Sequence, residues 1–318
     1  MFVLSPMEDR KKQARGLEEV SHFFLSGQTA PEEARKLTVE EVLADAGEIT
    51  TVPDGIARKE GVQDEVYRAP VKRSSCLLFF SNSLFAEQSF LSCNLALELA
   101  RRDFSVGLIE TTTRLPNTFF LLGSLFPVPP TPPALEPLRL IDISIGACKN
   151  IKAVFLEKDF GSSDSFTILN RLNSESDFLI INASPAVFGL REMISFINPF
   201  FIVPTTVRSE ELLNSYSLIK QISLGVSRGE VGLLIMEERF GQKAEAAFGV
   251  ITEMAHKFLS CKIRFMGPIP KGADLSRSIL TRTPLLLEGE NSSISQSIRK
   301  LADGLIQEIH SFEGNPQW

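Results

Sequence analysis

The chain contains 318 residues, of which 43% are hydrophobic and 23% charged, a composition typical of a folded globular protein rather than a disordered one. Its formal net charge of -6 provides no basic field, so we expect no nucleic-acid partner. The four cysteines form no CxxC pair and the three histidines are scattered, which argues against a zinc site and against a disulfide scaffold.

The N-terminal sequence lacks the features of a signal peptide. Charged residues from Glu8 to Lys12 precede any long apolar run. Elsewhere no apolar stretch is long enough to span a bilayer. We therefore expect a cytoplasmic protein that does not bind the membrane directly.

Residues 1–46 are predicted to form a small helical arm. Ala14, Leu17 and Val20 recur at helical spacing, which predicts a helix over about residues 8–26. Two Thr-x-x-Glu sequences follow and fit the capping box at the start of two short helices.

Residues 47–73 are polar, carry prolines and glycines, and show no sustained period, so we expect a flexible linker.

From residue 74 on, the pattern predicts one α/β domain over residues 74–312, followed by a short tail, 313–318. Apolar runs alternate with amphipathic, helix-like segments. Runs that are apolar without alternation are typical of strands buried on both faces of a parallel sheet. The predicted fold is therefore a doubly wound, mostly parallel sheet covered by helices. The expected strands are residues 76–80, 105–110, 178–182, 199–204, 231–236 and 262–267.

Two further segments stand out. Residues 127–137 are too rich in proline for a helix or a central strand and are expected to form a stiff surface spacer, although docking to an aromatic groove is an alternative. Residues 294–309 place apolar side chains on one stripe and are predicted to pack as a helix against the sheet.

Several stretches resemble the MinD/ParA group of P-loop ATPases and, within it, the FlhG-like proteins. They are residues 94–117, 176–222, 231–235, 266–287 and 298–306. Between residues 118 and 175 the likeness is only positional. The resemblance implies the P-loop NTPase fold of the deviant Walker A class.

The phosphate loop of the family reads SGKGGVGKTT, and this sequence lacks the lysines and glycines with which that loop binds phosphate. Ser83 stands at the signature lysine, Gln88 stands at the P-loop lysine, and Glu87 adds a carboxylate. Leucine and phenylalanine replace two glycines, whose backbone freedom lets amides approach phosphate. The vestigial loop comprises Ser81, Asn82, Ser83, Leu84, Phe85, Ala86, Glu87, Gln88 and Ser89. A reversal of local charge weakens phosphate binding by several kcal/mol, since a unit charge at 4 Å is worth about 4 kcal/mol at an effective dielectric of 20.

Other positions implied by the resemblance are altered too. Thr112 stands where an aspartate positions the attacking water, and Asn182 stands where the Walker B aspartate supports magnesium. Met236 occupies the position of an asparagine that reads adenine. Ser89 keeps a hydroxyl that could ligate a metal, but a lone hydroxyl is not a metal site.

We therefore interpret the chain as a pseudo-ATPase with no catalytic residue and no expected cofactor. The alternative is an atypical switch that still binds ATP and magnesium and dimerises on nucleotide. Leu84 and Phe85 have two interpretations: they plug the vacated phosphate cavity, or they form part of a partner surface.

The resemblance implies a scaffold or regulator that acts through protein contacts in placing a bacterial surface apparatus, such as a flagellum or pilus. Gln13 and Leu17 in KQARGLE match part of the FlhG motif that engages an FlhF-like GTPase, although the same helix could fold back on the domain. Other candidate partners are an active MinD/ParA paralogue and a second copy of the chain. Partners would then recruit the protein to the pole or to the inner membrane face.

Overall fold

The computed structural model describes residues 74–112, 114–123, 140–145, 148–156, 163–183, 197, 199–225, 230–237, 242–259, 261–288 and 292–313. The chain divides into two units, Met1–Pro70 and Val71–Trp318, and every described residue belongs to the second. The predicted arm, with Gln13 and Leu17, lies outside the described residues. The same holds for the linker up to residue 73 and for the proline-rich segment 127–137.

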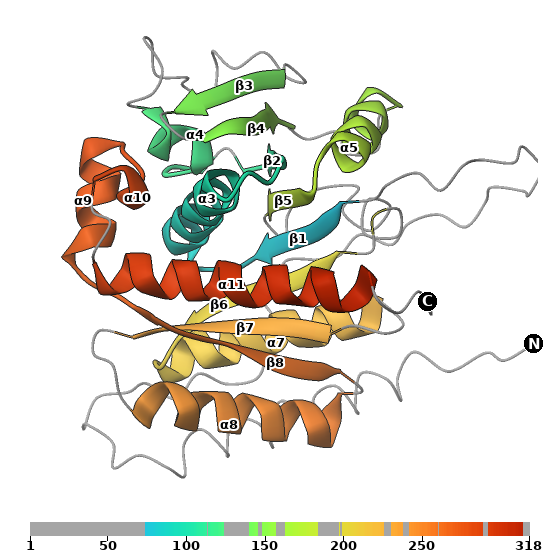
Figure 1. Cartoon of the computed structure of the whole chain (residues 1–318). Helices are drawn as coiled ribbons and strands as arrows, with labels where there is room; N and C mark the ends of the chain where they lie inside the picture. The colour runs from blue at the N-terminus through green and yellow to red at the C-terminus, as the bar shows by residue number, and fades with distance from the viewer. Residues whose placement is uncertain are drawn as a thin grey trace, which may run out of the picture. The chain divides into compact units, whose positions relative to one another are not determined.

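A single sheet forms the centre of the second unit (Figure 1). Among the described residues its strand order is β3-β4-β2-β5-β1-β6-β7-β8, and all neighbours are parallel except β3 and β4. The predicted doubly wound, mostly parallel fold is confirmed. The strands are β1 (Ser75–Phe80), β2 (Val106–Glu110), β3 (Leu140–Ile145), β4 (Cys148–Phe155), β5 (Phe178–Ala183), β6 (Phe200–Thr206), β7 (Glu230–Glu237) and β8 (Lys262–Pro270).

The helices cover the sheet in two groups. α3 and α11 pack against each other, and Figure 1 shows α11 across the front of the strands; α7 and α8 pack together against β6, β7 and β8. The helices are α3 (Phe85–Arg101), α4 (Thr118–Leu121), α5 (Ser163–Glu175), α7 (Ser209–Gly225), α8 (Gln242–Phe258), α9 (Ala273–Thr281), α10 (Leu285–Glu288) and α11 (Ser293–Glu313).

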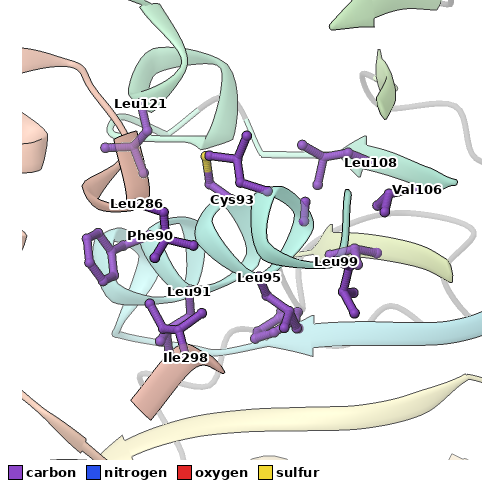
Figure 2. Close-up of a cluster of buried hydrophobic side chains, with 14 of the residues drawn as sticks. Phe90, Leu91, Cys93, Leu95, Leu99, Val106, Leu108, Leu121, Leu286 and Ile298 are labelled. Atoms are coloured by element: carbon purple, nitrogen blue, oxygen red, sulfur yellow. The ribbon is translucent and has the colours of Figure 1, made fainter. Parts of the chain in front are cut away.

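Helix α3 lies at the centre of the hydrophobic core (Figure 2). Every residue from Gln88 to Ala100 is buried, and the figure shows apolar side chains of α4, α10, α11 and β2 around the helix. A helix that is buried on all sides lies in the interior, although α3 also buries polar side chains, among them Gln88, Asn94 and Glu98. Its buried Asn94 is hydrogen-bonded at both ends of the amide: Nδ2 donates to the carbonyl of Phe90, and Oδ1 accepts from the amide of Leu286 on α10.

The strands differ from the prediction in two respects: one strand is longer than predicted, and one hairpin was not predicted. The strand predicted to end at residue 267 continues as β8 to Pro270, through Gly267 with φ 103° and two prolines. β8 is hydrogen-bonded on one side only in the described sheet, and an edge strand tolerates prolines. The hairpin β3–β4 was not predicted, although Leu140–Ile145 alternates between apolar and other residues.

Among the residues that the structure describes, no helix is long and apolar enough to cross a membrane.

Candidate functional site

The candidate site lies where the strand order changes direction, at the carboxyl ends of β1, β5 and β2. In open α/β sheets this is the place where ligands bind. The registers pair Phe79 of β1 with Asn182 of β5, and Asn182 with Glu110 of β2. The turn from β1 into α3 therefore faces side chains from two other strand ends.

The turn from β1 into α3 is short, and its backbone amides are hydrogen-bonded to neighbouring groups of the protein. Ser81 Oγ accepts hydrogen bonds from the amides of Leu84, at 2.9 Å, and Ser83, at 3.3 Å. Helix α3 already begins at Phe85, and the amide of Gln88 donates to the carbonyl of Leu84 at 2.8 Å. Three amides that a phosphate loop would direct at a ligand are thus bonded within the turn.

Gln88 is the buried link between β1 and β5. It is 1% exposed, and its Nε2 donates to the carbonyl of Phe79 (3.0 Å), the carbonyl of Ala183 (2.8 Å) and Oδ1 of Asn182 (2.6 Å). Two amide hydrogens thus face three acceptors, a number that an ammonium group would match. Its Oε1 is buried and has no hydrogen-bond partner among the described residues.

Asn182 carries the network from α3 to β2. Its Nδ2 donates to Ser89 Oγ at 3.0 Å and to Glu110 Oε2 at 2.7 Å, while its Oδ1 accepts from Gln88. All four side chains are buried. The donors at these positions are engaged with neighbours inside the protein, so a ligand would have to displace existing hydrogen bonds.

Glu110 is the acceptor at the centre of this network. Its Oε1 accepts from the amides of Thr111 (3.0 Å) and Thr112 (2.8 Å). Its Oε2 accepts from the amide and the hydroxyl of Thr118, both at 2.9 Å, and from Asn182. Five donors leave this carboxylate no lone pair directed at a metal ion or a water molecule.

Burial is the main influence on the ionisable groups here. It raises the pKa of the Glu110 carboxyl above its ordinary value, and the hydrogen bonds from Thr118, Asn182 and Thr112 act in the opposite direction. Burial also raises the pKa of the Cys93 thiol, and the nearby charge of Glu110 adds to this effect. A thiol kept protonated is a poor nucleophile.

The structure changes the expected role of Glu87. The sequence suggested that this carboxylate reverses the local charge, but Glu87 Oε1 forms an ion pair with Lys271 Nζ at 2.7 Å. Lys271 follows β8, far away in the sequence, and its amide donates to the carbonyl of Glu237. The pair is locally neutral, so repulsion of phosphate by Glu87 is weaker than we expected.

The other predicted loop positions divide into buried and exposed ones. Leu84 is buried, whereas Phe85 is half-buried and lies under the guanidinium of Arg114, 4.6 Å from its ring centroid. Asn82 and Ser83 are exposed, and Ala86 is half-buried. The sequence left open whether Leu84 and Phe85 plug the phosphate cavity or form part of a partner surface. In the structure Leu84 is buried, whereas Phe85 is partly exposed.

Ser83, at the position of the signature lysine, contacts a helix of its own domain. Its hydroxyl donates to Glu211 Oε2 of α7 at 2.5 Å. This hydrogen bond ties the turn after β1 to the first turn of α7.

The side chains of Thr112 and Met236 stabilise the structure around them. Thr112 Oγ1 accepts from the amide of Arg114 at 3.1 Å and is buried, so its hydroxyl stabilises the loop after β2. Met236 is 1% exposed and belongs to the hydrophobic core. Neither side chain joins the Gln88–Asn182–Glu110 network.

Sequence reasoning missed Glu110 and Lys271 as members of the site region. A signal for Glu110 was present, because a charged residue that ends a buried strand needs partners. Nothing in the sequence pointed to the Lys271–Glu87 pair. In the described part of the chain, no group of three or more His, Cys, Asp or Glu side chains is placed to hold a metal ion.

Comparisons of the sequence with protein-family models and with curated proteins gave no match. Comparison of structures shows the fold: 172 solved chains match, among them MinD proteins, a ParA family ATPase and a plasmid partition protein.

Three solved structures illustrate the likeness. A chain of the MinC:MinD cell division complex of Aquifex aeolicus has a TM-score of 0.57 and 15% identity, covering 74% of this chain and 96% of that one. MinD with Mg-ADP from Pyrococcus horikoshii has a TM-score of 0.55 and 15% identity, with coverages of 74% and 97%. A complex of a Cyanothece McdA variant with ATP has a TM-score of 0.55 and 14% identity, with coverages of 75% and 97%. The chain therefore has the fold of the MinD/ParA P-loop ATPases.

Proposed function

We propose that this protein is a non-catalytic regulator or scaffold with a MinD/ParA-type fold, whose former nucleotide site now stabilises the domain. The observation that carries the proposal is the buried network of Gln88, Asn182 and Glu110, which fills the strand ends with hydrogen bonds between protein groups. Polar groups that satisfy one another in a dry interior rigidify a fold.

The fit of the residues to ATP and magnesium is poor. A nucleotide phosphate needs free amides and an ammonium group, but the amides of Ser83 and Leu84 are bonded to Ser81, and Gln88 is neutral. Magnesium needs free carboxylate or hydroxyl oxygens, but Glu110 already accepts five hydrogen bonds and Ser89 accepts one. We derive no catalytic step for this site.

In this proposal the protein acts through contacts with other proteins rather than through a nucleotide-dependent switch. The Aquifex MinD structure was solved in complex with the protein MinC, which shows that this fold supports protein partners. For this chain we propose a role in positioning or assembling a bacterial surface apparatus, flagellum or pilus, with an FlhF-like GTPase or an active MinD/ParA paralogue as partner.

The deciding experiment is isothermal titration of the full-length protein with ATP and with ADP, each with magnesium. We expect no saturable heat up to millimolar nucleotide. Saturable micromolar binding that is abolished in Gln88→Ala would overturn the proposal and make an ATP-dependent switch the better description. Co-purification with an active paralogue, and nucleotide binding only in that mixture, would instead identify a regulatory subunit.

A matched variant, Gln88→Lys, sharpens this test. It places an ammonium group among the three acceptors that now surround Nε2, while the turn at Ser81 keeps its amides. We expect Gln88→Lys not to bind ATP, because one restored charge does not replace the lost amides. Binding by this variant would mean that the turn opens readily.

A further inference from the structure

We draw no further inference here: the strongest candidate, the outer edge of the sheet at β3, which is hydrogen-bonded to β4 alone among the described strands, carries none because nothing in the structure shows what covers it.

Discussion

Two neighbouring regions of this domain differ in whether their polar side chains are buried or exposed. In the network around Glu110, donors and acceptors face one another in the interior, and both Glu110 and Asn182 are fully buried. A few residues further along the chain, the guanidinium of Arg114 lies on the ring of Phe85 and remains exposed, and Arg282 lies on the ring of Phe120 in the same way.

The difference predicts where substitutions change the stability of the fold. A buried polar group that loses its partner pays the desolvation penalty in full, so substitution in the network should lower the free energy of unfolding. An exposed side chain contributes little to folding, so substitution of Arg114 or Arg282 should change the free energy of unfolding only slightly.

The largest effect is expected for Glu110→Ala. This change leaves five donors without their acceptor, including the amides of Thr111, Thr112 and Thr118. We expect a loss of about 4 kcal/mol or more in the free energy of unfolding, measured by urea denaturation. The control Glu253→Ala removes an exposed carboxylate of α8 and should change stability by less than about 0.5 kcal/mol. Equal effects of the two substitutions would show that the network contributes nothing to stability.

Gln88→Met should come second. Methionine has a similar size but no N–H, so the carbonyls of Phe79 and Ala183 and the Oδ1 of Asn182 lose their donor. We expect a loss of about 2 kcal/mol, because the removal of the unpartnered Oε1 offsets part of the penalty. Gln221→Met, at an exposed position of α7, serves as the control in the same denaturation experiment. A neutral Gln88→Met would mean that its hydrogen bonds are replaced by water.

The pH dependence of the free energy of unfolding should reveal the raised pKa of the Glu110 carboxyl. Burial raises its pKa in the folded protein above the ordinary value of 4.5, whereas the unfolded chain keeps the ordinary value. In the interval above 4.5 the folded state therefore holds more protons, and the free energy of unfolding falls as the pH rises through the raised folded pKa.

The slope from one such group is at most about 1.4 kcal/mol per pH unit, and Glu110→Gln removes this contribution. The measurement is the difference in unfolding free energy between the wild type and Glu110→Gln from about pH 4 to about pH 8. A constant difference would show that the five hydrogen bonds outweigh burial and keep the carboxyl ionised.

The smallest effect on stability is expected for Arg282→Gly. Glycine relieves the left-handed strain at φ 53°, while the contact with the Phe120 ring is lost. These opposing changes are each about 1 kcal/mol, so we expect a net change within about 0.5 kcal/mol of zero. Calorimetric melting of the wild type and the variant measures this net change. A marked loss of stability would show that the contact between Arg282 and the Phe120 ring outweighs the backbone strain.

Much of the fold could be predicted from local pattern. The continuous apolar runs predicted β1, β2, β5, β6, β7 and part of β8, because strands buried on both faces must be apolar throughout. The hairpin β3–β4 was missed, since β3 is an antiparallel edge strand with a weaker, alternating pattern. For the candidate site, the resemblance pointed to Gln88 and Asn182, but the sequence did not identify Glu110 as their partner.

The sequence by itself determined the parallel α/β fold, since continuous apolar runs depend on residue type and spacing along the chain. The loss of lysines and glycines at a phosphate loop stays a prediction from the resemblance. Only the tertiary structure decided how the replacing side chains pair. Gln88, Asn182 and Glu110 meet because three strands place their ends together, and Glu87 is neutralised by a lysine 184 positions away. Hydrogen bonds and ion pairs act over a few ångströms in space, so their partners cannot be identified from order along the chain.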